Sequence, residues 1–303
     1  MEDLGDPPID RSLLDEIGPW TEMKHDIVSE YARAYSAVMS NSRSLAPFHH
    51  YYIDGFASAG HSVRRGTGEI LRGSALRSLE VQPPFDHHHF VELDPRRATE
   101  LRKHSLGHPV TVIEGDANVV LPRIFSETRY QNYERAFCLL DPYSEDALAW
   151  ETIVAAARAK TIDLLLHFPT MAINRNCLPK NGMPTEDAAE RLTRFWGDDS
   201  WRRTAYEDDG LFQGTLFEGG IPFKQPNEVI LDAFRKRLVE NAGFAGASLP
   251  IPMKNGKGNT VYHLIFAAHN GTALRIMQGV AKKYAKVHQP YAVRPLTSAR
   301  TAS

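Results

Sequence analysis

Cysteine is scarce in this chain, and long apolar runs are missing. Only 2 of the 303 residues are cysteine, with no disulfide framework and no zinc spacing: Cys138 lies in an apolar run and Cys177 in a polar segment. Such sparse cysteine is typical of a reducing compartment. The acidic N-terminus has no apolar signal-peptide region, and no stretch approaches the roughly 18 apolar residues of a membrane span. We therefore expect a cytoplasmic protein that does not enter a membrane.

An excess of charge of either sign is also missing. Lys and Arg total 35 and Asp and Glu total 37, which gives a net charge of −2. This balance argues against a protein that coats nucleic acid through overall positive charge, although it leaves room for a local basic groove. The apolar fraction of 42% and the charged fraction of 24% are those of an ordinary globular protein. The length suits one large α/β domain with an insertion, or two domains.

Five short apolar runs alternate with segments of helical pattern. The runs cover residues 51–53, 89–91, 110–113, 137–140 and 162–168, and the helical segments between them cover 74–81, 95–104, 118–125 and 145–160. An amphipathic helix at 21–39 precedes the runs. This alternation of strand and helix predicts a parallel sheet with right-handed crossovers. The runs are apolar throughout, as expected of strands that are covered on both faces.

The pattern changes after residue 169. Residues 178–245 carry helical pattern, clustered aromatics (Phe195, Trp196, Trp201, Tyr206) and a glycine-rich stretch (Gly210, Gly214, Gly219, Gly220), and we interpret them as an insertion. Two β-rich runs at 249–253 and 260–268 flank a Gly/Asn turn and predict a hairpin, followed by a helix at 271–285. Parallel strands closed by an antiparallel hairpin predict the seven-stranded, mostly parallel sheet of a Rossmann-like class I methyltransferase fold.

These patterns divide the chain into five parts. We expect an N-terminal surface arm at 1–18 and a ligand-binding core at 19–177. The insertion follows at 178–245, then the closing hairpin and helix of the core at 246–288, and a flexible tail at 289–303.

A loop of small residues follows the first strand. It reads Asp54-Gly55-Phe56-Ala57-Ser58-Ala59-Gly60. Small residues let the backbone approach a ligand closely, and in a doubly wound sheet this loop lies at the carboxyl edge, where ligands bind. The loop lacks the GxGxxG pattern, which makes a dinucleotide less favoured. We assign Asp54, Gly55, Phe56, Ala57 and Gly60 to cofactor binding; the alternative is a plain strand-to-loop turn.

Acidic residues also end the next two strands. Glu92 could accept both ribose hydroxyls of a nucleoside, and the neighbouring Leu93 could lie against an adenine. Asp116, followed by Ala117, could accept the adenine amino group, or it could simply cap the next helix. Three acids at consecutive strand ends, facing a Gly/Ala loop, predict a site for an adenosyl ligand.

The fourth strand ends in Asp141-Pro142-Tyr143-Ser144. This sequence resembles the Asp-Pro-Pro-Tyr element by which amino-methyltransferases hold a target nitrogen, although only one proline is present. The carboxylate of Asp141 would accept N–H bonds from the acceptor and Tyr143 would stack on a planar substrate, so that alignment does most of the catalysis. We assign Asp141, Pro142 and Tyr143 to catalysis and Ser144 to substrate binding. The alternative is a proline-defined turn that caps a helix starting at Glu145 through Ser144.

Other polar residues are weaker candidates. Arg64, Arg65 and Arg72, in the loop after Gly60, could contact phosphate, and Asn174 and Arg175 could face substrate or only solvent. The run His87-His88-His89 does not predict a metal site, because consecutive strand residues point to opposite faces. No cysteine follows a proline at the expected active edge, so a covalent C5-pyrimidine mechanism has no nucleophile.

In their order, these motifs resemble the three-Cys-motif partner family of bacteria. The resemblance covers about residues 18–285. It rests on the stretches 51–60, 73–76, 90–94, 115–118 and 140–143, on Trp20 with Lys24, on Phe195-Trp196-Gly197 with Trp201, and on 262–267. It implies a fold that binds S-adenosylmethionine (SAM), with Lys24 at the cofactor, and a helical or winged-helix-like insertion. It also implies a partner, a radical-SAM-type protein with a three-cysteine motif.

The chain departs from that family at two motifs. The family's Asp-Leu-Phe-Ala-Gly-Pro-Gly is here Asp54-Gly55-Phe56-Ala57-Ser58-Ala59-Gly60, and its Asp-Pro-Phe-Gly is Asp141-Pro142-Tyr143-Ser144. The first change is mild because serine is small.

Our leading hypothesis is methyl transfer from SAM to an amino nitrogen of an RNA base, with single-stranded or looped RNA avoiding most of the cost of flipping the base. One alternative is methylation of a peptide or small metabolite made by the radical-SAM partner, which the near-neutral charge favours. Another alternative is a non-catalytic binding module of the same fold. The sequence does not indicate an oligomeric state.

Overall fold

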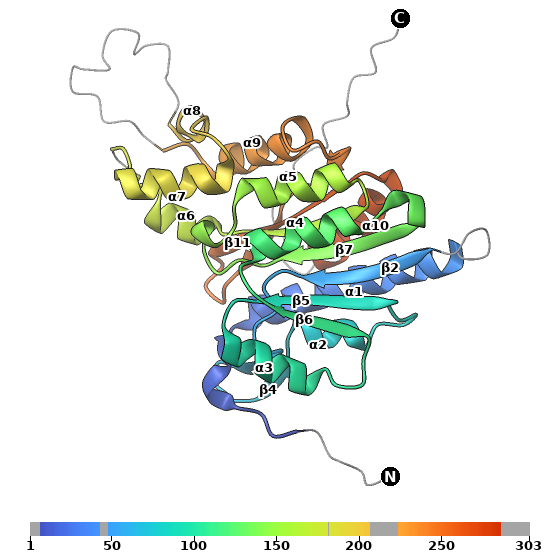
Figure 1. The fold of residues 1–303 in the computed structure, drawn as a ribbon. Coiled ribbons are helices and arrows are strands. Elements are labelled where there is room, and N and C mark those ends of the chain that lie inside the picture. The colour runs from blue at the N-terminus through green and yellow to red at the C-terminus, as the bar shows by residue number, and fades with distance from the viewer. Residues whose placement is uncertain (1–6, 43–47, 181, 207–223, 286–303) are drawn as a thin grey trace, which may run out of the picture.

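One large sheet forms the centre of the protein. The computed structural model describes residues 7–42, 48–180, 182–206 and 224–285. The sheet has the order β10-β11-β8-β7-β2-β5-β6, and a short β9 pairs with β11 (Figure 1). Its strands are β2 (His49–Asp54), β5 (His87–Glu92), β6 (Val110–Glu114), β7 (Glu134–Leu140), β8 (Ile162–Phe168), β9 (Gly246–Ala247), β10 (Ile251–Lys254) and β11 (Thr260–Ala268).

The pairing of the strands confirms the predicted fold class. From β6 to β8 the strands are parallel, whereas β11 runs antiparallel to β8 and β10 antiparallel to β11. All five predicted parallel strands and the closing hairpin are present, so the chain has the Rossmann-like class I methyltransferase fold. The short strand β9 is an addition that we did not predict.

Each central strand contributes side chains to two separate cores. In β7, Ala136, Cys138 and Leu140 join one core, while Phe137 and Leu139 join the other, and all five are fully buried. Side chains of consecutive strand residues point to opposite faces. Because helices cover both faces, the strand is apolar at every position instead of at alternate ones.

Helices cover the two faces of the sheet in separate layers. The first core lies under α4 (Ala117–Glu127), α5 (Trp150–Ala159) and α6 (Thr170–Asn176). The second lies under α1 (Pro19–Ser42), α2 (Ser74–Leu79) and α10 (Gly271–Ala285), and α3 (Pro95–His104) adds Leu101 to it (Figure 1). The predicted helix at 145–160 is divided, because a 3-10 turn η3 (Glu145–Ala147) precedes α5; a second such turn, η2 (Tyr130–Asn132), precedes β7.

A second, smaller sheet was not predicted. It joins β1 (Asp15–Ile17), β3 (His61–Arg64) and β4 (Ile70–Arg72) in the order β1-β3-β4, and η1 (Arg11–Leu13) leads into it. The part of the predicted arm that the structure describes therefore pairs with the main body. The segment that we expected to be a loop after Gly60 is a hairpin instead. Strands of three or four residues are too short for a clear alternating pattern, which explains the error.

The described part of the insertion is helical and shares a core with the sheet. It contains α7 (Glu186–Trp196), α8 (Trp201–Ala205) and α9 (Asn227–Glu240). Phe195 and Phe234 stack with ring centroids 5.2 Å apart, and Phe168 of β8 lies 5.0 Å from Phe234. The four glycines of the predicted glycine-rich stretch and the predicted tail at 289–303 lie outside the described residues, and the winged-helix-like character of the insertion stays a prediction.

Within the ranges that the structure describes, no helix combines the length and the apolar character that crossing a membrane would need.

Candidate functional site

A cleft of about 770 Å³ opens at the carboxyl ends of β2, β5 and β6. This volume is in the usual range for a site that encloses a nucleoside-sized ligand. The three segments that follow these strands all contribute to its wall. The predicted cofactor residues that line it are Gly55, Phe56, Glu92, Leu93, Asp116 and Ala117. Three of the loops that the sequence singled out therefore meet at one cleft.

The loop after β2 is held in place by Asp54. The carboxylate of Asp54 is fully buried and accepts hydrogen bonds from the Ser74 hydroxyl (2.6 Å) and the Phe56 backbone N–H (3.2 Å). Burial raises the pKa of Asp54 to about 6, although both hydrogen bonds oppose that rise. Asp54 is not among the residues that line the cleft. The structure therefore places Asp54 as a brace for the loop and not at the ligand surface.

Close packing explains the small residues of this loop. A Cβ atom at Gly55 would lie 2.8 Å from a side-chain carbon of Leu140, and Gly60 has a φ of +82°. The Ala57 N–H donates to the Val91 carbonyl, 3.0 Å away. Ala57 and Gly60 do not line the cleft, so we place them with Asp54 among the residues that shape the loop.

Glu92 and Leu93 form the part of the wall that follows β5. The two oxygens of the Glu92 carboxylate accept the N–H groups of Ser58 and Asp94, each at 2.8 Å. Each carboxylate oxygen can accept a second hydrogen bond, so Glu92 keeps capacity for a ligand hydroxyl. The side chain of Leu93 is 69% exposed, and it lines the cleft. An exposed leucine on a cleft wall offers an apolar surface to a flat ligand.

Asp116 caps α4 as well as lining the cleft. Its carboxylate accepts the Asn118 N–H at 2.8 Å, which confirms the capping alternative. Asn118 then joins two elements: its side-chain amide donates to the Ala147 carbonyl and accepts from the Ala149 N–H. Sequence reasoning missed Asn118 in this role, because its partners lie about thirty residues away along the chain.

Asp141 lies beyond the end of β7 in a cluster of charged and aromatic side chains. The Lys24 ammonium of α1 forms an ion pair with one Asp141 oxygen, and Nδ1 of His167 on β8 lies 2.7 Å from the other. The ring of Tyr262, on β11, packs on His167 with centroids 4.0 Å apart. Burial alone would raise the pKa of Asp141, but Lys24 and His167 outweigh it and hold that pKa well below its usual value. Asp141 is therefore ionised at neutral pH.

The structure does not place Lys24 on the cleft wall, although the resemblance implied cofactor binding for it. Its partner Asp141 is 117 residues away in sequence. His167 and Tyr262 are further members of the cluster that the site prediction omitted.

Tyr143 connects the cleft to the N-terminal strand. It is 60% exposed, lines the cleft, and its hydroxyl accepts from Arg97 (2.7 Å) and donates to Asp15 (3.1 Å). Arg97 also forms a two-pronged ion pair with Asp15 at 2.8 and 2.9 Å. Asp141 and Pro142 do not line the cleft. Asp15 of β1 and Arg97 therefore hold the Tyr143 side chain at the cleft.

The other predicted substrate residues lie away from the cleft. Arg64 pairs with Glu22 and Glu69, Arg65 with Glu16, and Arg72 with Glu80. Asn174 and Arg175 lie on α6, and neither lines the cleft. The Ser144 hydroxyl binds the Asp146 carboxylate and makes no capping bond to η3. Arg194, from the insertion, does line the cleft, and we did not predict it.

No protein-family model and no curated protein matches this sequence. Among solved structures, a Legionella pneumophila protein of a family labelled DUF519 aligns over 87% of this chain and 92% of its own, at 10% identity and a TM-score of 0.44.

Two further structures are SAM-dependent methyltransferases. One from Leishmania major aligns over 81% of this chain and 73% of its own, at 11% identity and a TM-score of 0.37. One from Anabaena variabilis aligns over 88% and 97%, at 11% identity and a TM-score of 0.29. Because these values are low, we infer the function from the residues of this chain alone.

Proposed function

We propose that this chain is a SAM-dependent methyltransferase that acts on an amino nitrogen, with an RNA base as the leading substrate. One observation carries the proposal: three strand ends meet at a nucleoside-sized cleft, and a largely buried, ionised aspartate follows the strand beside them. Gly55 on the cleft wall donates its N–H to the Leu139 carbonyl, so the end of β7 lies directly against the cofactor loop.

The cleft residues fit the adenosine part of SAM. Glu92 retains free lone pairs for ribose hydroxyls, and the exposed Leu93 offers an apolar surface to the adenine. Asp116 uses one oxygen for capping and has a second for the adenine amino group. When bound, SAM supplies an electrophilic methyl group on its sulfonium. The residues of the chain bind and orient the reacting groups, which is the main requirement of methyl transfer.

Asp141 fits the task of holding the acceptor nitrogen. Its carboxylate accepts one bond from Lys24 and one from His167, which leaves lone pairs for an N–H of the substrate. An acceptor N–H directed at Asp141 turns the nitrogen lone pair away from the carboxylate. The exposed ring of Tyr143 provides a stacking surface for a flipped or unpaired base, as single-stranded RNA requires.

A second candidate substrate is a peptide or small metabolite made by a radical-SAM-type partner, as the three-Cys-motif partner resemblance implies. A specific observation favours it: all three arginines that we expected at phosphate are paired with acids. The net charge of −2 agrees with this second candidate. The chain would keep the same SAM site and the same role for Asp141 in either case.

A labelled-methyl assay tests the proposal. The full chain is incubated with SAM carrying a labelled methyl group and with either total RNA, protein extract or the small-molecule fraction. Label in RNA supports the leading substrate, and label in another fraction supports the second. No label in any fraction, together with SAM binding measured by calorimetry, would leave a non-catalytic binding module.

Variants separate the roles of the two carboxylates. Asp141→Ala, if thermal unfolding shows it to be folded, should reduce transfer at least about 100-fold and leave SAM affinity nearly unchanged, because in this proposal Asp141 contacts the acceptor and not the cofactor. Glu92→Gln should instead weaken SAM binding about tenfold. Arg72→Ala, on the small sheet, is the control and should change neither quantity. Unchanged transfer by Asp141→Ala would remove that residue from the mechanism.

A further inference from the structure

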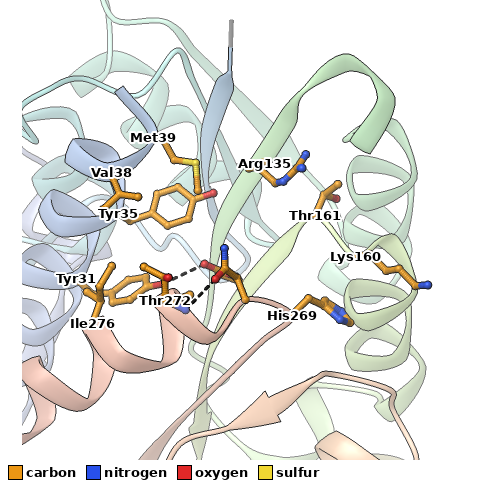
Figure 2. Close-up of a pocket in the computed structure, with 13 residues that line it drawn as sticks. Tyr31, Tyr35, Val38, Met39, Arg135, Lys160, Thr161, His269, Thr272 and Ile276 are labelled. Carbon is orange, nitrogen blue, oxygen red and sulfur yellow. Dashed lines mark hydrogen bonds between the residues drawn. The ribbon is translucent and has the colours of Figure 1, made fainter. Parts of the chain in front are cut away.

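A second cavity, of about 70 Å³, lies near the amino ends of β7 and β8, whereas the cleft lies at the carboxyl ends of the strands. Figure 2 shows the residues that line this cavity. It is enclosed by α1 and α10, by the starts of β7 and β8, and by the segments that flank them. One water needs about 10–15 Å³ of such space, so the cavity has room for a ligand of roughly four or five heavy atoms. The methyltransferase proposal makes no use of this cavity.

Asp163 provides an acid that has no cationic partner. It lies at the start of β8, lines the cavity, and accepts one hydrogen bond, from the Tyr31 hydroxyl at 3.0 Å. No Lys, Arg or His among the described residues forms an ion pair with it. Burial raises the pKa of Asp163 to about 7, although the Tyr31 hydrogen bond and the charge of Arg135 lower it. A buried carboxylate in this situation is stabilised by any positive charge that reaches it.

Tyr35 provides an unused polar group beside this acid. Its side chain is only 3% exposed, and its hydroxyl has no hydrogen-bond partner within the described residues. In Figure 2 the Tyr35 hydroxyl points from α1 into the cavity, and the ring of Tyr31 lies below it. An unsatisfied buried hydroxyl costs free energy, and a ligand that bonds to it recovers that cost. The two aromatic rings also suit a cation, because ring faces attract positive charge.

We propose that this cavity binds a small protonated amine. The ammonium group would donate to the Asp163 carboxylate and to the Tyr35 hydroxyl oxygen, against the aromatic wall of α1. Two cationic residues also line the cavity, but Lys160 is solvent-exposed and the Arg135 guanidinium stacks on Tyr130, 4.0 Å from its ring centroid. A small anion would have to lie beside the Asp163 carboxylate, which disfavours it.

The binding should strengthen as the pH rises from about 6 to about 8, because the ionised form of Asp163 is the one that pairs with an ammonium. The other titratable or charged groups that line the cavity are Tyr31, Tyr35, Arg135, Lys160 and His269. Burial lowers the pKa of His269, which favours its neutral form, and raises those of both tyrosines well above their ordinary values, so the tyrosines keep their protons in this range.

Ethylammonium chloride is a suitable probe, followed by ligand-observed NMR with the full chain at pH 8. Ethanol, which has the same number of heavy atoms but no charge, is the matched control, and sodium chloride holds the ionic strength constant. We expect saturable binding of ethylammonium and none of ethanol. Absence of saturable ethylammonium binding would overturn the proposal, and so would equal binding of ethanol or tighter binding of acetate.

Two nearly isosteric variants locate the probe. Asp163→Asn should weaken ethylammonium binding at least tenfold, and Tyr35→Phe several-fold, while thermal unfolding shows that both variants remain folded. Retained affinity in a folded Asp163→Asn variant would place the amine elsewhere. The experiment does not depend on methyl transfer, so its outcome is independent of the proposed enzyme activity.

Discussion

Asp141 and Asp163 are two largely buried aspartates that belong to neighbouring parallel strands but lie at opposite ends of them. Asp141, beyond the carboxyl end of β7, has a buried lysine and a histidine as partners. Asp163, near the amino end of β8, has one tyrosine hydroxyl. The pKa of Asp141 is held well below its usual value, whereas burial raises that of Asp163 to about 7. Two aspartates of similar burial therefore have pKa values shifted in opposite directions, and the presence of a neighbouring cation determines the direction.

Asp54 extends the comparison. It is fully buried, accepts two hydrogen bonds and forms no ion pair with a described residue, and burial raises its pKa to about 6. Neutral donors therefore reduce the effect of burial without reversing it. Of these three aspartates, Asp141 is the one that forms an ion pair with a buried ammonium, and it is the one that the proposed chemistry needs in its ionised form.

Removal of Lys24 should produce the largest effect. Lys24→Met leaves the Asp141 charge buried beside only a neutral histidine, and the loss of one partner of a buried pair typically costs about 3–5 kcal/mol of unfolding free energy. Lys283→Met is the matched control, since Lys283 is 64% exposed in its pair with Glu30 and should matter by less than about 1 kcal/mol. Urea denaturation at pH 7 measures both. Equal costs for the two variants would show that the Lys24–Asp141 pair is not a buried one in solution.

Asp163→Asn should change the pH dependence of stability. Because the folded-state pKa of Asp163 lies near 7 and the ordinary value is 3.8, the folded protein binds the extra proton between these values. The unfolding free energy that this group contributes therefore falls as the pH rises from about 4 to about 7, by up to roughly 4 kcal/mol at about 1.4 kcal/mol per pH unit. Asparagine cannot ionise, so the variant should gain stability relative to the natural chain across that window.

Denaturation of both proteins at pH 5 and pH 8 gives the difference. The contribution of Asp141 does not interfere, because its lowered pKa acts only below about pH 4. Burial lowers the pKa of His25 to about 3 and those of His88, His89 and His263 to about 4, which also makes stability depend on pH, but these residues are common to both proteins and their effects cancel. A difference in stability that does not grow with pH would mean that Asp163 has a cationic partner in solution.

The sequence predicted the cleft better than it predicted the charged clusters. Glu92, Leu93 and Asp116 follow apolar runs directly, and a parallel sheet brings consecutive strand ends to one edge. The pairing of Lys24 with Asp141 depends instead on how α1 crosses the sheet, which no local pattern encodes. That no cation among the described residues forms an ion pair with Asp163 likewise depends on how α1 and α10 pack over the sheet.

The sequence pattern also failed to show that three predicted phosphate-binding arginines form ion pairs within the protein. Arg64, Arg65 and Arg72 appeared available for phosphate because the short strands β3 and β4 were not recognised. Their acidic partners come from α1, β1 and the end of α2, as well as from their own hairpin. The roles of the cleft residues in cofactor and substrate binding stay predictions until the variants above are measured.

The hydrogen bond from Tyr31 to Asp163 gives the smallest expected effect and tests the charge state of Asp163 directly. Tyr31→Phe removes that donor without changing the ring, and a hydrogen bond to a charged group is worth about 1.5–3 kcal/mol, against about 0.5–1.5 kcal/mol for a neutral one. Since Asp163 changes charge near pH 7, the variant should cost about 1 kcal/mol more at pH 8 than at pH 5.5. In an Asp163→Asn background the side chain cannot ionise, so Tyr31→Phe should cost nearly the same at both pH values. If the cost of Tyr31→Phe varies with pH in the same way in both backgrounds, ionisation of Asp163 does not cause the variation, and the contrast between Asp163 and the permanently ionised Asp141 does not hold.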